Sequence, residues 1–311
     1  MIKRAGYPAE VHVVMTEDGY LLTLHRIPGG NDSLPVLLQH ALLCSSADWV
    51  ILGKGKALAY LLADQGYDVW LGNFRGNIYS RAHMSLSPSD LTFWNFSFHE
   101  MSIYDLPAII KFITNMKSQP LHTYIGHSMG TTTFYVMASE RPEIARMVKM
   151  MISFGPAAFI KHFKSPMLIN LFSYWREFQS LLPVILSHFP AGISIKTFLH
   201  YIQIYQSDKF RQYDYGREKN QLMYNSPEPP DYNLTSITIP IALFYGPGDW
   251  AIDVVDVKRL YDLLPNVVDL YEVPWPKFNH VDFIWAKDAP KLVYERVLEL
   301  MKGKHLNNDY R

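Results

Sequence analysis

The middle of the chain contains the stretch Thr123-Tyr124-Ile125-Gly126-His127-Ser128-Met129-Gly130-Thr131, from which the rest of the architecture can be worked out. Apolar and β-branched residues predict a buried strand over 122–126, and a helix is predicted over 131–139. Between them lies the pattern G-x-S-x-G. This pattern is typical of a nucleophile elbow, in which a strand leads into a sharp turn with a serine at its tip and then into a helix. The residues near the serine are glycines because a Cβ there would keep the helix away from the strand. The stretch predicts Ser128 as a nucleophile, and the plainer alternative is a Gly-Ser turn that caps a helix.

Short apolar or β-branched runs alternate with longer amphipathic ones on both sides of this stretch, which favours an α/β fold with a mostly parallel sheet flanked by helices. Further strands are predicted over 11–16, 20–26, 35–39, 67–72, 149–154, 241–245 and 267–273, and further helices over 57–65, 99–116 and 290–301. From residue 156 to 237 the chain is rich in aromatics and shows no clear strand pattern. We therefore predict one core, residues 1–155 and 238–311, that carries a helical insertion, residues 156–237.

A serine hydroxyl is a weak nucleophile unless a base takes its proton and an acid orients that base. In folds built around a nucleophile elbow, the chain order is serine, acid, histidine. Asp249 follows the predicted strand 241–245 in a tight turn, so it is the first candidate for the acid. Asp253 is the second candidate, and for both Asp253 and Asp256 the plainer role is capping of a helix. His280 is the candidate base, because the only later histidine, His305, lies in the polar tail.

The tetrahedral intermediate of such a reaction needs two backbone N–H donors. One is expected on Met129, the residue after the nucleophile, and the other on Leu42, in the loop after the strand 35–39. His40 lies in the same loop, and its plainer role is to anchor that loop rather than to take part in the chemistry. Cys44 has no base beside it in the sequence and is interpreted as a small buried residue.

The composition excludes several classes of function. The 29 Lys and Arg residues balance the 29 Asp and Glu residues, so no basic field exists to attract nucleic acid. One cysteine allows no intrachain disulfide and no cysteine-based zinc site. No apolar run approaches the roughly 18 residues of a membrane span. Residues 6–10 are polar where the apolar part of a secretory signal would lie, so no signal peptide is predicted in the chain as given.

Blocks along most of the chain resemble the acid lipase family, which comprises the animal gastric and lysosomal acid lipases of the α/β-hydrolase superfamily. They include Gly66–Asn73, Arg75-Gly76-Asn77, Phe93–Ser97, Tyr104–Pro107, Gly126–Thr132 and Asn279–Ala286. The resemblance implies an α/β-hydrolase fold with a helical cap. It also implies hydrolysis of lipid esters such as triacylglycerols or cholesteryl esters through an acyl-enzyme, at a lipid–water interface and without a cofactor or metal.

By the same resemblance, Ser128, Asp249 and His280 form the catalytic triad, and Leu42 and Met129 form the oxyanion hole. The family is secreted or delivered to lysosomes. Three N-glycosylation sequons, at Asn31, Asn95 and Asn233, are consistent with that route.

The chain departs from the family pattern in three places. Ala41 replaces a glycine and could crowd the oxyanion loop, and Met129 replaces a glutamine whose side-chain amide is lost. Residues 165–182 do not match, and the insertion is shorter than in relatives. Its aromatics, Phe172, Tyr174, Trp175 and Phe178, either repack into a smaller cap or form an exposed patch for lipid contact or self-association. The alternative function is therefore a catalytically impaired or non-catalytic lipid-binding relative.

Overall fold

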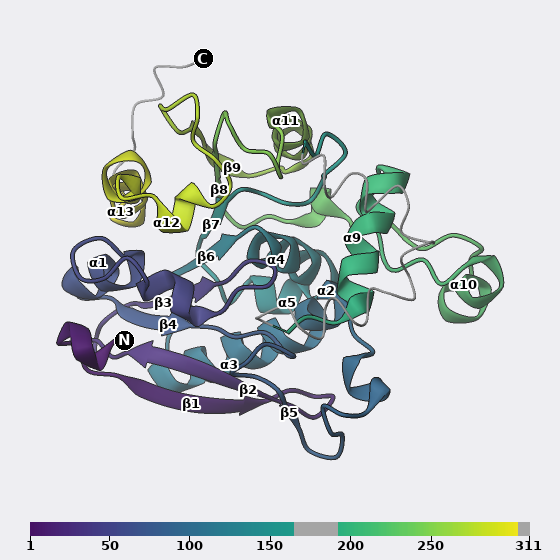
Figure 1. Ribbon diagram of the computed structural model, residues 1–311, viewed down its shortest axis with the longest axis horizontal. Coiled ribbons are helices and arrows are strands. Elements are labelled where there is room, and N and C mark those ends of the chain that lie inside the picture. Colours follow the sequence, from purple (N-terminus) through teal and green to yellow (C-terminus); the bar gives the residue numbers. More distant parts are fainter. Residues whose placement is uncertain (165–191, 304–311) are drawn as a thin grey trace.

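The computed structural model describes residues 1–164 and 192–303 of the chain (Figure 1). Within them one nine-stranded sheet has the strand order β1-β2-β4-β3-β6-β7-β8-β9, and β5 pairs with β2. The strands are β1 (Glu10–Met15), β2 (Tyr20–Ile27), β3 (Pro35–Gln39), β4 (Asp68–Leu71), β5 (Ala82–His83), β6 (Thr123–His127), β7 (Met151–Phe154), β8 (Ile241–Tyr245) and β9 (Val267–Glu272). All pairings from β4 to β9 along this order are parallel, whereas β1, β2 and β5 add antiparallel pairings. The predicted mostly parallel sheet is confirmed.

The sheet has a separate hydrophobic core on each face, and alternate residues of the central strands belong to one core or the other. On β6, Tyr124 belongs to one core and Ile125 to the other, as the period of two in a strand requires. The first core includes residues of α3 (Leu106–Lys117), α4 (Met129–Glu140), α5 (Pro142–Ala145) and α11 (Val254–Leu263). The second includes residues of α1 (Leu58–Asp64), α12 (Asp282–Trp285), η6 (Pro290–Tyr294) and α13 (Glu295–Met301). Figure 1 shows α1, α12 and α13 on one side of the strands and α4 and α5 on the other.

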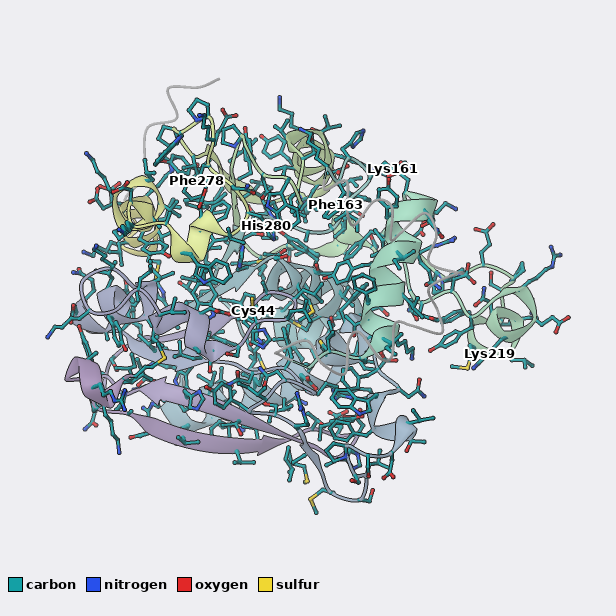
Figure 2. All side chains as sticks on the ribbon, viewed as in Figure 1. Cys44, Lys161, Phe163, Lys219, Phe278 and His280 are labelled. Carbon is teal, nitrogen blue, oxygen red and sulfur yellow. The ribbon has the colours of Figure 1, made fainter. Side chains whose placement is uncertain are left out.

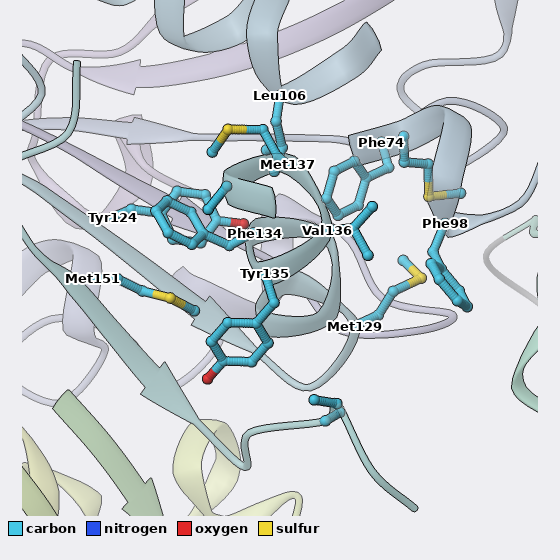
Figure 3. Packing of buried hydrophobic residues seen from close by; sticks show 14 of the residues in the cluster. Phe74, Phe98, Leu106, Tyr124, Met129, Phe134, Tyr135, Val136, Met137 and Met151 are labelled. Atoms are coloured by element: carbon cyan, nitrogen blue, oxygen red, sulfur yellow. The ribbon is translucent and has the colours of Figure 1, made fainter. Parts of the chain in front are cut away.

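Helix α4 is held on all sides. Residues 129–138 are all buried, and the Phe134 ring packs 4.6 Å from the ring of Tyr124 on the strand before it. Figure 3 shows the side chains of α4 surrounded by Phe74, Phe98, Leu106 and Met151 from neighbouring elements. A helix packed in this way cannot shift easily, so the turn that precedes it is fixed in place.

The helix predicted over 99–116 is present but contains a π-helical turn. It consists of α2 (Phe98–Glu100), η4 (Met101–Asp105) and α3, with Pro107 in the first turn of α3. A proline has no N–H for the carbonyl four residues earlier, that of Ile103. Arg141 Nη1 donates to this carbonyl at 2.9 Å, so a side chain from the junction between α4 and α5 supplies a donor there.

Between β7 and β8 the described residues form helices and no strand: α9 (Ile195–Ser207), α10 (Arg217–Tyr224) and η5 (Leu234–Ser236). Helix α9 lies along one side of the core and α10 projects from it (Figure 1). The unmatched segment 165–182, with Phe172, Tyr174, Trp175 and Phe178, lies outside the described residues, as does His305. Among the helices that are described, none combines the length and the apolar character of a membrane span.

Candidate active site

Ser128 stands at a sharp turn between β6 and α4. Its backbone has φ 52° and ψ −114°, a conformation that side-chain-bearing residues rarely adopt and that costs on the order of 1–3 kcal/mol. A Cβ on Gly126 would lie 2.7 Å from the carbonyl carbon of Gly130, and a Cβ on Gly130 would collide with the Gln39 carbonyl of β3. Both glycines are therefore required by close backbone approach, as the sequence pattern predicts.

Asp249 and His280 come from the loops after β8 and β9 and are joined by a 2.8 Å contact between Asp249 Oδ2 and His280 Nδ1. Both residues are buried. The other carboxylate oxygen, Oδ1, accepts the backbone N–H groups of Ala251 and Ile252 at 2.7 and 2.9 Å. The carboxylate is thus fixed on both sides, and because it takes Nδ1, the imidazole keeps Nε2 for another partner.

Ser128 and His280 line the same cavity, whose volume is about 620 Å³. The end of β7 contacts both: the Ser128 N–H donates to the Phe154 carbonyl at 2.9 Å, and a Cβ on Gly155 would lie 2.9 Å from His280 Cε1. The rest of the lining is mainly apolar and includes Ile160, Phe163, Phe198, Trp250, Ile252 and Ile284. Figure 2 labels Phe163, Cys44 and His280 of this lining in the central part of the molecule. Such a cavity suits an apolar ligand.

Leu42 lines this cavity too, and Met129 begins helix α4 directly after Ser128. Within residues 1–164 and 192–303, neither the Leu42 N–H nor the Met129 N–H has a hydrogen-bond acceptor. The first N–H groups of a helix have no partner inside it, and they carry the positive end of its dipole. Among the described residues, two backbone donors are therefore left without an acceptor, one in the lining of the cavity and one directly after Ser128.

Ala41, which replaces a glycine of the family, does not need the backbone freedom of a glycine. The residue of this loop with a left-handed backbone is Leu43, with φ 63°, and not Ala41. The Ala41 side chain belongs to the cavity lining. The methyl group of Ala41 therefore lies in the wall of the cavity, on a backbone without a positive φ.

His40 is buried and anchors the loop, as its plainer interpretation predicts. Its Nδ1 lies 2.8 Å from the Ala41 carbonyl oxygen, and its Nε2 accepts the Phe74 N–H at 3.1 Å. Asn77 Nδ2 lies 3.2 Å from the same Nε2. Burial lowers the pKa of His40 to about 4, so the ring is neutral at pH 7.

The second candidate acid, Asp253, caps helix α11 by accepting the Val255 N–H at 2.9 Å. It also pairs with Lys164 at 2.5 Å. Asp256 lies one turn further along α11, where its carboxylate accepts the His162 backbone N–H at 2.9 Å and contacts His162 Nδ1 at the same distance. Asp253 has the capping role that the sequence suggested, whereas Asp256 binds a neighbouring segment instead.

One feature near the serine has no counterpart in the sequence reasoning, and one differs from it. His127 Nε2 lies 2.9 Å from the main-chain oxygen of His280, so a side chain directly before the serine contacts the loop of the candidate base. Burial holds the pKa of His127 well below its usual range. Cys44, which the sequence suggested is a small buried residue, is only partly buried because it lines the cavity. The burial that it does have raises the pKa of its thiol, which keeps it protonated. The only sequence signal for His127 is its place inside the G-x-S-x-G pattern, directly before Ser128.

The parts of the chain that the structure describes contain no group of three His, Cys, Asp or Glu side chains that could hold a metal ion.

Comparison with known proteins first defines the class to which this protein belongs. Residues 1–53 match a family described as a partial alpha/beta-hydrolase lipase region, and residues 35–183 match the alpha/beta hydrolase fold. The esterase Pf2001 of Pyrococcus furiosus has a similar structure, with a TM-score of 0.60 and 19% identity over 98% of this chain and 95% of that one. The protein is an α/β-hydrolase.

Curated relatives then give the family. The chain is 39% identical to Lipase 1 of Drosophila melanogaster, over 97% of this chain and 78% of the relative. It is 38% identical to human gastric triacylglycerol lipase, over 97% and 89% of the two chains. It is 37% identical to human lysosomal acid lipase/cholesteryl ester hydrolase, over 96% and 88%. The chain belongs to the acid lipase family and is a carboxylic ester hydrolase, and the alternative of a non-catalytic relative is not favoured.

Proposed function

We propose that this protein hydrolyses long-chain lipid esters, triacylglycerols or cholesteryl esters, through an acyl-enzyme on Ser128. The observation that carries the proposal is the buried Asp249–His280 pair, whose imidazole shares an apolar cavity with a serine on a strained turn. The gastric and lysosomal relatives are named for these two kinds of substrate.

In this reaction the Ser128 hydroxyl attacks the ester carbonyl carbon while His280 Nε2 takes its proton. Asp249 holds Nδ1 and stabilises the imidazolium that forms. His280 then gives the proton to the leaving alcohol, and the acyl group stays on Ser128. Water, deprotonated by the same imidazole, releases the fatty acid and restores the serine.

The N–H groups of Leu42 and Met129 are the proposed oxyanion donors. They are supported by their lack of other acceptors among the described residues and by their place beside Ser128. Hydrogen bonds to the developing oxyanion are stronger than those to the ground-state carbonyl, which is why such donors accelerate the reaction.

The proposed cap comprises residues 156–237 on a core of residues 1–155 and 238–311. Its described part supplies Ile160, Phe163, Phe198 and Tyr201 to the cavity, which makes it the proposed wall of the acyl groove. Alignments with the relatives run over 345 to 361 positions, more than the 311 residues of this chain, which supports a shorter insertion here.

The proposed partner is a lipid–water interface, and no cofactor enters the reaction. Two side chains of the cavity lining, Ile78 and Trp285, are 54% and 49% exposed, which fits contact with an apolar surface. The three sequon asparagines, Asn31, Asn95 and Asn233, are all exposed, which fits a glycoprotein that is secreted or delivered to lysosomes. Self-association through the cap remains a proposal that rests on residues outside the described ones.

The test is turnover of emulsified trioleoylglycerol and cholesteryl oleate by the purified protein, measured as released oleate. We expect hydrolysis of at least one of them, and none by Ser128→Ala, which keeps the fold because it removes only one oxygen atom. Hydrolysis of neither ester, with short soluble esters cleaved, would overturn the assignment to long-chain lipid esters. Equal activity of the variant would overturn the role of Ser128.

A further inference from the structure

The peptide bond between Ala41 and Leu42 has its carbonyl held by two donors. His40 Nδ1 lies 2.8 Å from the Ala41 oxygen, and the Cys44 N–H donates to the same oxygen at 3.2 Å. In a planar trans peptide the carbonyl and the N–H point in opposite directions. Holding the Ala41 carbonyl therefore also sets the direction of the Leu42 N–H, which has no acceptor among the described residues.

The His40 ring is itself held in one protonation state. The Phe74 N–H can only donate, so Nε2, 3.1 Å away, must accept and carry no proton. The ring proton then lies on Nδ1, where it can be donated to the Ala41 carbonyl. Burial supports this state because it lowers the pKa of His40 to about 4, and a protonated ring could not accept from Phe74.

The loop is tied at its other end to the same neighbouring segment. Asn77, whose Nδ2 lies 3.2 Å from His40 Nε2, donates to Asn73 Oδ1 at 2.8 Å. That oxygen also accepts the Ser46 N–H at 2.9 Å. Residues 40 and 46 are thus both bound to the segment 73–77 after β4. Cys44, labelled in Figure 2, lies between these two ends.

We infer that His40 is a positioning residue for catalysis: its Nδ1–H holds the Ala41–Leu42 peptide so that the Leu42 N–H is presented to the oxyanion. The inference rests on the proposed function and adds to it the group that keeps the oxyanion hole formed. If this peptide turned over, the loop would lose both bonds to the Ala41 oxygen and would place a carbonyl where a donor is needed.

Two substitutions separate this role from simple anchoring of the loop. The amide of His40→Asn reaches the position of Nδ1, so it can still donate to the Ala41 carbonyl but leaves the Phe74 N–H unpaired. The amide of His40→Gln reaches the position of Nε2, so it can accept from Phe74 but cannot hold Ala41. If His40 acts by positioning the oxyanion donor, His40→Asn should be the more active variant. If it acts only by anchoring the loop through Phe74, His40→Gln should be the more active one.

The experiment compares kcat and KM of these variants on a soluble p-nitrophenyl ester and on its thiono analogue, in which sulfur replaces the carbonyl oxygen. Sulfur is a poor acceptor, so the ratio of oxo to thiono turnover reports on the oxyanion donors and is independent of the folded fraction. Loss of one oxyanion donor lowers the rate by about 10²–10³, and a displaced donor should cost less than a lost one. We therefore expect His40→Gln to lower kcat roughly 10–100-fold with little change in KM, and to reduce the oxo/thiono ratio. His40→Asn is expected to keep the wild-type ratio and most of the activity.

His200→Asn is the matched control, because His200 is equally buried and bonds to Ser97 Oγ and the Arg211 carbonyl away from the cavity. It should lower stability without changing the ratio. If His40→Gln does not fold, Asn77→Ala is the substitute: it leaves the Phe74 N–H on Nε2 but removes the Asn77 contact with the ring and the bond to Asn73, and the looser ring should reduce the ratio. An unchanged ratio in the folded variants, or a higher ratio in His40→Gln than in His40→Asn, overturns the inference. An inactive wild type overturns the proposed function itself.

Discussion

Asp249 receives three hydrogen bonds, one from His280 and two from the backbone, and this fixes which nitrogen of the imidazole carries the proton. An asparagine at this position would keep the backbone bonds in part but would favour the wrong tautomer. We expect Asp249→Asn to lower kcat on the order of 10⁴-fold. The comparison is Asp253→Asn, which should weaken only the cap of α11. A larger loss of kcat for Asp253→Asn, at equal folded fraction, would show that the acid is misassigned.

His200 gives a prediction for stability as a function of pH. Burial lowers its pKa to about 3, from about 6.5 in an unfolded chain. The folded state therefore binds this proton less readily than the unfolded state does. The contribution of neutral His200 to the free energy of unfolding is complete above pH 6.5, and it is lost as the pH falls from 6.5 towards 3. From pH 7 to pH 4 the loss is about 3 kcal/mol, at 1.36 kcal/mol per pH unit.

The measurement is urea unfolding of the wild type and of His200→Asn at pH 7 and pH 4. The difference in unfolding free energy between the two should shrink at pH 4, because the variant has no imidazole to protonate. A constant difference would contradict the buried neutral state of His200.

At this scale, the sequence predicts candidate residues but not how their side chains bond: the structure joins Asp249 to His280 and places Ser128 and His280 in the lining of one cavity. Ser128, Asp249 and His280 could be found because each follows a recognisable strand in the required chain order. The contact of His127 with the His280 carbonyl joins residues 153 positions apart. Nothing in the local pattern of either segment specifies such a bond, because it depends on how two loops pack. The bonds of His40 to Phe74 and Asn77 are of the same kind.

At the scale of elements, the turn between β6 and α4 depends on Gly130. A Cβ there would meet the carbonyl oxygens of Gln39 and His40, so α4 would have to move away from β3. We expect Gly130→Ala to destabilise the fold by about 1–3 kcal/mol and to reduce turnover, because Met129 N–H moves with the helix. Chemical unfolding and kcat of the folded fraction are the measurements.

Gly30→Ala is the matched control, since Gly30 has no atom within 4 Å of an added Cβ and no left-handed backbone. It should change stability and turnover little. If Gly130→Ala were as stable and as active as Gly30→Ala, the close approach of α4 to β3 would not be what requires the glycine.

The strands were easier to predict than the helices. The limits of β3 and β8 agree with the prediction, because both are short apolar runs that end at a turn signal. Helix α11 was not predicted, although its cap, Asp253, was recognised, because ten residues give a weak helical period. The π-helical turn η4 could not be predicted either, because its Ile103 carbonyl is bonded by Arg141 from the distant junction between α4 and α5, a contact that no local pattern specifies.

At the scale of the whole molecule, the cavity lining reaches the surface at Ile78 and Trp285. If the protein works at a lipid–water interface, Ile78→Ser should lower hydrolysis of emulsified esters several-fold and change hydrolysis of a soluble butyrate ester much less. Leu91→Ser is the control, because Leu91 is 90% exposed but is not part of the cavity lining. Equal effects of both changes on the emulsion would contradict a docking role for the cavity mouth.

The α/β core could be predicted from the sequence because the alternation of strands and helices is regular, and the comparisons confirm its fold. The insertion between β7 and β8 was predicted only as a helical region. Its aromatic residues are compatible with several packings, and a sequence pattern does not choose among them.

The central claim is that His280 activates the Ser128 hydroxyl, and labelling by a fluorophosphonate tests it most directly. The wild type should be labelled in one peptide, with the phosphonyl group on Ser128 by mass spectrometry, and His280→Ala should be labelled at least 100-fold more slowly while remaining folded. Labelling of another residue, or an unchanged rate in His280→Ala, would contradict the account.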